Sequence, residues 1–492
     1  MTDLADLTIA QASAGLREGS FSSIDLLDSA ERRAAVSEPH LHAYLTLDRD
    51  GARQAANAAD RAIANGDSRP LVGIPIAVKD NMVTKGVETT AGSQILAGWK
   101  PPYDGTAVRR LRESGAVIVG KTNLDEFAMG SSTENSAYGP TRNPWNTDTV
   151  PGGSSGGSAA VVAVGSALGA FGSDTGGSIR QPASLTGTVG AKPTYGLVSR
   201  YGLIAFASSL DQIGPIARTV PDAATLLEAV VGWDALDATS YSGAVPALSR
   251  SLDTGVAGLR VGVVRELVGD GIEPDVLEAT QATIERLAGA GADIVELSVP
   301  AIEYALSAYY LIAPAECSSN LARFDGVRYG LRVDGATTEE MMAKTRAEGF
   351  GPEVIRRILL GTYALSAGYY DAFYGQSQRV RTLLRRDFAA AYDQVDVLVS
   401  PTSPSTAFEI GSKTADPLTM YLSDICTIAT NLAGDPAISV PVALGGDGLP
   451  IGFQIMAPAL GEEVMFRVAA EVERSAGFTE RAKLATSEVV AP

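Results

Sequence analysis

Short apolar runs alternate with longer stretches of helical pattern along most of this 492-residue chain. Apolar runs bounded by turn residues are typical of buried strands, and chains in which such runs alternate with helices form α/β folds. We therefore predict an α/β fold in which a mixed, twisted β-sheet is covered by helices on both faces. The predicted strands include residues 116–119, 260–264, 292–297, 395–400, 437–444 and 451–455.

Two segments in the first half of the chain depart from this simple pattern. Residues 72–78 are apolar, but Pro75 cannot donate to a sheet ladder, so we expect an irregular or edge strand. Residues 158–171 are small, apolar and too few to span a membrane, so we expect a buried helix.

Further along, residues 304–321 and 352–392 have the pattern of long helices.

The chain contains no repeat of fixed period and no Pro/Ser-rich linker. We therefore predict one domain over residues 1–492. It consists of an N-terminal helical arm (1–66), a core (67–220) and the remaining sheet and helices (221–492).

The formal net charge of −18 limits the partners that this chain can hold. Such a chain repels nucleic-acid backbone and anionic membrane surfaces, so we expect another subunit to bind any nucleic acid. The first residues carry acid and no long apolar run, so we expect no signal peptide. Two distant cysteines, Cys317 and Cys426, favour a reducing cytoplasm over a disulfide framework.

Histidine is scarce, because the chain has two, His40 and His42, both in the N-terminal arm. A Ser-His-Asp or Cys-His site would need one of this pair to reach the core. A zinc site would have too few nitrogen and sulfur ligands, so we expect no metal. If the chain is a hydrolase, its base is expected to be a lysine or a carboxylate.

Two Gly/Ser loops, residues 152–158 and 173–180, each lead into a helix start. Glycines let a substrate approach the backbone closely, and free N–H groups at a helix start stabilise negative charge. These are the requirements of an oxyanion hole, and the candidate N–H donors are those of Thr175, Gly176, Gly177 and Ser178. Composition alone favours a flexible turn or a phosphate cradle.

Lys79 ends the apolar run that begins at Val72. A lysine in this position usually extends its ammonium group to water. If the side chain is buried instead, desolvation lowers its pKa and makes the neutral amine a usable base. Sequence alone favours the exposed position.

The loops and the lysine together resemble the amidase signature family. Lys79 lies in a Val-Lys-Asp element, Ser154 is the first serine of Gly-Gly-Ser-Ser-Gly-Gly, and Ser178 closes Asp-Thr-Gly-Gly-Ser. The resemblance implies a Ser-Ser-Lys triad with a cis peptide between Gly153 and Ser154. In that triad Ser178 attacks an amide, Ser154 relays the proton, and Lys79 accepts it.

Other blocks resemble the amidase components of tRNA-dependent amidotransferases, namely residues 123–132, 139–144, 309–310 and 318–330. Stand-alone amidases usually lack the last of these blocks. The resemblance implies a glutaminase subunit of a heterotrimer, with no cofactor of its own. Its ammonia would pass to a B subunit, which uses ATP and Mg²⁺ to amidate Glu-tRNA(Gln) or Asp-tRNA(Asn), and a small C subunit would brace the pair.

The same resemblance implies three residues for binding glutamine. Arg357 would bind the α-carboxylate, Asp424 the α-amine, and Tyr309 would line the pocket. The neighbouring residues Arg356 and Tyr310 are alternatives at a shift of one position. Two residues depart from the family pattern, Cys317 and Asp435, and the second puts the shape of its loop in doubt.

Four alternatives remain at this stage. Residues 115–122 match the phosphate-binding P-loop pattern, but the predicted strand lies inside the pattern and not before it. Asp174-Thr175-Gly176 matches an aspartic-protease triplet, which needs a second carboxylate that we do not find. A scaffold subunit would not need Lys79, Ser154 and Ser178 together. A stand-alone amidase acting on small aliphatic or aryl amides would be active without partners.

Overall fold

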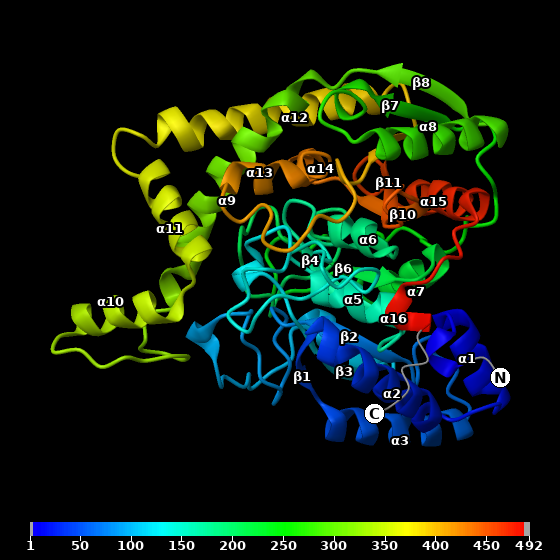
Figure 1. Cartoon of the computed structure of the whole chain (residues 1–492), viewed down its shortest axis with the longest axis horizontal. Helices are drawn as coiled ribbons and strands as arrows, with labels where there is room; N and C mark the ends of the chain where they lie inside the picture. Colours follow the sequence, from blue (N-terminus) through cyan, green and yellow to red (C-terminus); the bar gives the residue numbers. More distant parts are fainter. Residues whose placement is uncertain (1–2, 487–492) are drawn as a thin grey trace.

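The computed structural model of this protein describes residues 3–486. Its centre is one mixed sheet with the strand order β1-β3-β2-β4-β6-β5-β10-β11-β9-β7-β8 (Figure 1). The strands are β1 (Tyr44–Leu47), β2 (Pro75–Lys79), β3 (Val117–Thr122), β4 (Gly169–Asp174), β5 (Val189–Lys192), β6 (Gln212–Ala217), β7 (Arg260–Val264), β8 (Asp293–Leu297), β9 (Val397–Pro401), β10 (Ala437–Leu444) and β11 (Pro450–Met456).

Helices pack on both faces of this sheet, which confirms the predicted α/β fold. They are α1 (Ile9–Glu18), α2 (Ser23–Leu41), α3 (Arg49–Ala64), α4 (Thr106–Glu113), α5 (Gly156–Val164), α6 (Arg180–Thr186), α7 (Val220–Val230), α8 (Pro274–Gly289), α9 (Ala305–Asn320), α10 (Thr338–Gly349), α11 (Pro352–Ala364), α12 (Gln376–Tyr392), α13 (Pro417–Tyr421), α14 (Ile428–Ala433), α15 (Glu462–Ala476) and α16 (Lys483–Thr486).

The interior strand β2 shows how one strand contributes to the packing on both faces of the sheet. Ile76 and Val78 join a core that includes side chains from α1, α7, α8 and α15. Ala77, which points to the opposite face, joins a core built with α2, α3 and α5. This alternation follows from the two-residue period of a strand, and it leaves Lys79 at the strand's carboxyl end.

Of the predicted irregular or edge strand at residues 72–78, the irregularity is confirmed, because the pairing of β2 with β3 shifts register between Ile76 and Ala77, and the edge position is wrong. β2 lies in the interior of the sheet, parallel to both β3 and β4, and all of its residues are buried. Pro75 is tolerated because it is the first residue of the strand, a position where proline is allowed.

The predicted helix over residues 158–171 is also partly wrong. Helix α5 begins at Gly156 and ends at Val164, where Gly165 takes a left-handed conformation with φ of 83°. The chain then enters the buried strand β4 at Gly169. Buried helices and buried strands are both uniformly apolar, so residue type alone did not separate them.

Helices α10 and α11 extend away from the sheet layers, and α11 runs beside α9 (Figure 1). The segment predicted as long helices over 352–392 forms two, α11 and α12, joined by a short π-helical turn at Asp371–Gly375. Within residues 3–486, no helix combines the length and apolar character needed to cross a membrane.

Candidate active site

Lys79 is fully buried at the end of β2, so the expectation of an exposed ammonium group is wrong for this residue. Its Nζ atom donates a hydrogen bond of 2.8 Å to Ser154 Oγ. Burial lowers the pKa of Lys79 to about 7, although Asp125, Asp174 and Asp211 act in the opposite direction. Near neutral pH a large share of this amine is therefore unprotonated and able to accept a proton.

Three groups that sequence reasoning missed complete the surroundings of Lys79. Its Nζ donates to Ser155 Oγ at 2.8 Å and to Ser173 Oγ at 3.0 Å. Asn81 Nδ2 donates to the same Ser173 oxygen at 2.9 Å. Serine and asparagine are common throughout such a chain, so their sequence positions gave no signal. The fold brings these side chains around the Lys79 amine.

Ser154 lies in a fully buried loop between residues 151 and 156. The peptide bond between Gly153 and Ser154 is cis, as the family resemblance implied. Gln181 Oε1 accepts the Gly153 N–H at 2.9 Å and so fixes the chain just before this bond. A Cβ atom on Gly153 would lie 2.2 Å from a carboxylate oxygen of Asp125, so glycine is required there.

Ser178 lies at the end of the second loop, just before α6, and is 8% exposed. The two loops are joined where Ser155 N–H donates to the Ser178 carbonyl at 3.1 Å. Within residues 3–486 the Ser178 hydroxyl makes no hydrogen bond, so it is available to a substrate.

The second loop is held by a buried ion pair. Arg180 donates to both carboxylate oxygens of Asp174 at 3.0 Å, and Asn431 Nδ2 donates to Asp174 Oδ1 at 2.8 Å. Burial alone would raise the pKa of Asp174, but Arg180, Lys192 and Asn431 together lower it to about 2. This carboxylate therefore stays ionised and shapes the loop.

The Asp174 carboxylate also changes the set of N–H groups that can form the predicted oxyanion hole. The N–H of Gly177 donates to Asp174 Oδ1 at 2.8 Å, so this group is already used. Of the predicted donors, the N–H groups of Thr175, Gly176 and Ser178 have no such partner in the described part of the chain. Gly177 has φ of 136°, and a Cβ atom there would lie 2.1 Å from Thr427 Oγ1.

Two of the alternatives fail on geometry. Asp174 is paired with Arg180 and cannot share a proton as an aspartic-protease carboxylate does. Lys121 lies inside β3, where its Nζ contacts Asp80 Oδ1 at 3.0 Å and donates to the Met82 carbonyl at 2.8 Å. The residues of the P-loop pattern are thus a buried strand and not a phosphate-binding loop.

Tyr309 and the segment of Asp424 lie against the second Gly/Ser loop (173–180), and Arg357 is close enough to the Tyr309 and Asp424 side chains to oppose the rise in their pKa values that burial causes. A Cβ atom on Gly176 would lie 2.8 Å from the Tyr309 hydroxyl, so this ring covers the loop. Thr427 Oγ1 donates to the carbonyls of Gly176 at 2.6 Å and Asp424 at 3.1 Å, which ties the loop to Asp424. Burial raises the pKa of Asp424 to about 7, although Ser131, which donates to it at 2.5 Å, and Arg357 act in the opposite direction.

Arg357 is 3% exposed and lies among three aromatic rings. Its guanidinium carbon is 5.3 to 5.5 Å from the ring centres of Phe206, Tyr310 and Tyr421. Its Nε donates to Glu353 Oε1 at 2.7 Å, and within residues 3–486 its two terminal nitrogens donate to no protein group. The guanidinium can therefore hold a carboxylate through two parallel hydrogen bonds.

The structure separates the neighbouring alternatives. The Arg356 side chain is 45% exposed and pairs with Glu353, whereas Arg357 is 3% exposed, although both arginines line the same cavity. Tyr310 is not against the serine loop, because its ring stacks on Tyr421 with centres 3.8 Å apart. Of each neighbouring pair, Arg357 is thus the buried arginine and Tyr309 the tyrosine against the Gly176 backbone, and their roles in binding glutamine stay predictions.

The two departures from the family pattern lie outside this set of contacts. Asp435 is 9% exposed, and its backbone carbonyl accepts a hydrogen bond from the buried Lys192. Burial raises the pKa of Asp435 to about 6. Cys317 is buried and its Sγ lies 3.7 Å from Met129 Sδ.

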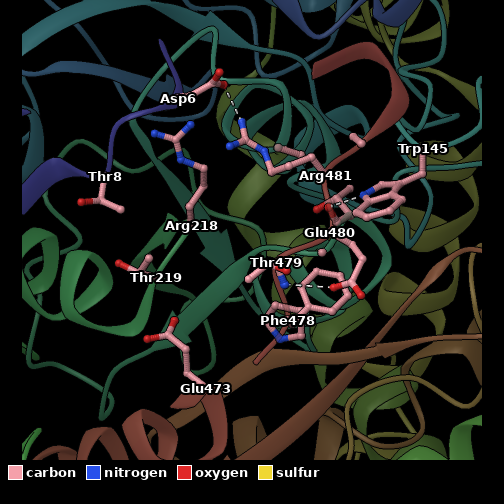
Figure 2. Close-up of a pocket in the computed structure, with 15 residues that line it drawn as sticks. Asp6, Thr8, Trp145, Arg218, Thr219, Glu473, Phe478, Thr479, Glu480 and Arg481 are labelled. Carbon is pink, nitrogen blue, oxygen red and sulfur yellow. Dashed lines mark hydrogen bonds and ion pairs between the residues drawn. The ribbon is translucent and has the colours of Figure 1, made fainter. Parts of the chain in front are cut away.

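A different cavity lies between the N-terminal arm and the last described residues (Figure 2). Its charged groups are already engaged, since Arg481 pairs with Asp6 at 2.8 Å and Arg218 donates to the Ala5 carbonyl at 2.7 Å. Its lining contains none of the predicted site residues. Over the described part of the chain, no cluster of three His, Cys, Asp or Glu side chains is arranged for a metal ion.

Comparison with known proteins gives a consistent answer. The family model described as Amidase matches residues 25–466. The A subunit of the glutamyl-tRNA(Gln) amidotransferase of Salinispora arenicola is 56% identical over 97% of this chain and 99% of that protein. The protein of the same name from Streptomyces coelicolor is 54% identical over 98% of each chain.

Solved structures agree. The crystal structure of the A subunit of the glutamyl-tRNA(Gln) amidotransferase of Thermotoga maritima is 43% identical, with a TM-score of 0.79 and 96% of each chain covered. The peptide amidase of Stenotrophomonas maltophilia is 32% identical, with a TM-score of 0.83 over 98% of this chain and 99% of that one. Matched over most of its length by the family model and by relatives of this identity, the chain belongs to the amidase family, as its two Gly/Ser loops indicated.

Proposed function

We propose that this chain is the glutamine-hydrolysing subunit of a tRNA-dependent amidotransferase. The observation that carries the proposal is the position of Arg357 and Asp424. Arg357 is a buried cation with unused donors, and the buried Asp424 is tied through Thr427 to the loop that holds Ser178. This pair matches the α-carboxylate and α-ammonium groups of a free amino acid, which simple aliphatic amides lack.

The chemistry begins with the neutral amine of Lys79. Lys79 accepts a proton from Ser154 as Ser154 accepts one from Ser178, and the Ser178 oxygen attacks the side-chain amide carbon of glutamine. The first link of this relay is supported by the 2.8 Å hydrogen bond between Lys79 and Ser154. The second link, between Ser154 and Ser178, is part of the proposal.

The attack gives a tetrahedral intermediate with a negatively charged oxygen. The N–H groups of Thr175, Gly176 and Ser178 are proposed to hold this oxygen. The proton returns along the relay to the leaving nitrogen, so ammonia departs and a glutamyl ester forms on Ser178. Water then attacks this ester with the relay again removing a proton, which releases glutamate and restores the serine.

Glutamine would be oriented at its other end. Arg357 would bind the α-carboxylate, Asp424 would accept hydrogen bonds from the α-ammonium group, and Tyr309 would form the wall between them and the loop. Glu353 supports this arrangement because it accepts from Arg357 Nε at 2.7 Å and from the Tyr421 hydroxyl at 3.0 Å. Both contacts hold the guanidinium in place before substrate arrives.

The ammonia is proposed to pass to partner subunits. A B subunit would use ATP and Mg²⁺ to activate Glu-tRNA(Gln) or Asp-tRNA(Asn), and a C subunit would complete a heterotrimer. The net charge of −18 supports a division in which this chain does not bind the tRNA. The cytoplasmic location expected from the sequence stays a prediction.

The decisive experiment measures ammonia release from glutamine by the tagged chain, purified from its own cells with its partners. Release that rises when ATP and Glu-tRNA(Gln) are added supports the amidotransferase role. Equal hydrolysis of glutamine and of simple amides by the lone chain, unaffected by tRNA, would instead establish a stand-alone amidase.

A further inference from the structure

The cavity that reaches Arg357 contains charged groups that the chemistry above does not use. Its lining includes Ser132, Glu134, Glu353, Arg357, Lys413 and Tyr421. Because Arg357 is part of this lining, the cavity is continuous with the proposed binding site for the α-carboxylate.

Two cations in this lining have no part in the chemistry above, and of these Arg356 pairs with Glu353 whereas Lys413 has no ion pair in the described part of the chain. Its segment lies between β9 and α13, and the side chain extends so that Nζ lies 4.0 Å from the ring centre of Phe408. Nζ donates to Ser423 Oγ at 3.1 Å, directly before Asp424 in the chain. In the described part of the chain Lys413 has no carboxylate partner, and burial lowers its pKa. Burial disfavours this ammonium group. Glu273 and Asp424 attract its charge, but neither carboxylate is within ion-pair distance among the described residues, so an anionic ligand could bind it directly.

Glu134 fixes the segment that carries Lys413. Its Oε1 accepts the Gly411 N–H at 2.7 Å, two residues before the lysine. Its Oε2 is buried and has no hydrogen-bond partner in the described part of the chain. Ser132 Oγ, in the same lining, is likewise buried without a partner. Polar atoms left unsatisfied in a cavity wall indicate that a polar ligand or water completes the site.

We propose that Lys413 is a second cation for the α-carboxylate of the substrate and thereby selects amino-acid amides over neutral amides. This inference rests on the proposed function. Arg357 would bind one edge of the carboxylate through its two terminal nitrogens, and Lys413, which lines the same cavity, would bind it as a compact charge. Glu134 is a positioning residue, because it acts through the segment and through Gly411.

The test compares two substrates in the complex purified with its partners. One is glutamine, and the other is the amide of 4-aminobutyric acid, which has the same chain and amine but no α-carboxylate. Lys413→Met should raise KM for glutamine about 10- to 100-fold, the range of one hydrogen bond to a charged group, with kcat changed less than about twofold. KM for the second amide should not change.

The matched control is Lys344→Met. Lys344 is on α10, where its exposed side chain pairs with Glu340 at 2.8 Å. This variant should leave both substrates unaffected. Lys413→Gln, which keeps a polar contact to Ser423 but removes the charge, should reproduce the KM effect if Lys413→Met fails to fold.

Three outcomes would overturn the proposal. An equal loss with both amides would show that Lys413 is only structural. An unchanged KM for glutamine in Lys413→Met would remove its role in binding. A wild-type complex that hydrolyses the carboxylate-free amide but not glutamine would defeat the proposed function itself, and this inference with it.

Discussion

Lys79 Nζ and Ser154 Oγ lie 2.8 Å apart, and both side chains are fully buried. Because burial lowers the pKa of Lys79 to about 7, the protonation of this pair should govern catalysis. The active form is the neutral amine, so kcat/KM should be low at acid pH, rise through about pH 7 and level off above it. A profile measured between about pH 5 and 9 tests this.

Replacing the lysine tests the assignment of the base directly. Lys79→Met should remove nearly all activity, because no other amine contacts Ser154 in the described residues. Lys121→Met should behave differently. Lys121 is bound to Asp80 and to the Met82 carbonyl, so its loss should lower stability and leave the pH dependence of the remaining activity unchanged. A rise through pH 7 that persisted in Lys79→Met would show that another group is the base.

Ser178→Ala should reduce glutamine hydrolysis by at least about a thousandfold while leaving the fold intact. The hydroxyl makes no hydrogen bond among the described residues, so its removal breaks no structural contact. Trapping with an electrophilic amide analogue followed by peptide mass analysis should locate the adduct on Ser178. Ser475→Ala, on α15, is the matched control and should retain full activity. Near-normal turnover by Ser178→Ala would contradict the nucleophile assignment.

Much of this arrangement was predictable from sequence, but not the burial of Lys79. The pattern placed the lysine at the end of an apolar run, where exposed and buried positions look alike. Lys79 is buried because β3 and β4 lie on either side of β2 in the sheet. The order of strands in a sheet does not follow from the local sequence pattern. Ser173 contacts Lys79 from 94 residues away, which again only the tertiary fold reveals.

Tertiary structure also explains why some strands, such as β6, were not predicted from the sequence. β6 contains Gly214 and Pro215, residues that are uncommon in strand interiors, yet it pairs along its whole length with β4. Tertiary packing overrides propensity here, because both faces of the strand are buried. The oxyanion donors were also only partly predictable, since a sequence does not show that Asp174 takes the Gly177 N–H. The single-domain organisation stays a prediction.

Arg357 and Arg356 provide a matched pair of neighbours on one helix, one buried and one exposed. Arg357→Lys should raise KM for glutamine about 10-fold or more, because an ammonium group cannot reproduce two parallel hydrogen bonds. Arg356→Lys should have little effect, because its side chain is 45% exposed and a lysine can keep its ion pair with Glu353. Steady-state kinetics with glutamine measure both. Equal KM values for the two variants would argue against Arg357 as the carboxylate ligand.

The Asp174–Arg180 pair allows a prediction about stability. Arg180→Met leaves a buried carboxylate without its main partner, so the free energy of unfolding should fall by about 3–5 kcal/mol. Asn431→Ala removes a hydrogen bond to the same carboxylate and one from Arg180, and at least about 1.5–3 kcal/mol should be lost. Denaturant unfolding followed by circular dichroism measures both losses.

The pH dependence of that stability has a definite sign. The pKa of Asp174 in the folded chain is lowered to about 2, below its usual value of 3.8. Its stabilisation is therefore complete above about pH 4 and is lost as the pH falls toward about 2. In Arg180→Met the pKa of this carboxylate should rise toward or above its usual value, so the contribution is largely absent and the stability gap between wild type and variant should narrow as the pH falls below about 4. If the free energies of unfolding of the two proteins changed in parallel between about pH 6 and 3, the assignment would be contradicted. The pair would then make no contribution to stability that depends on ionisation.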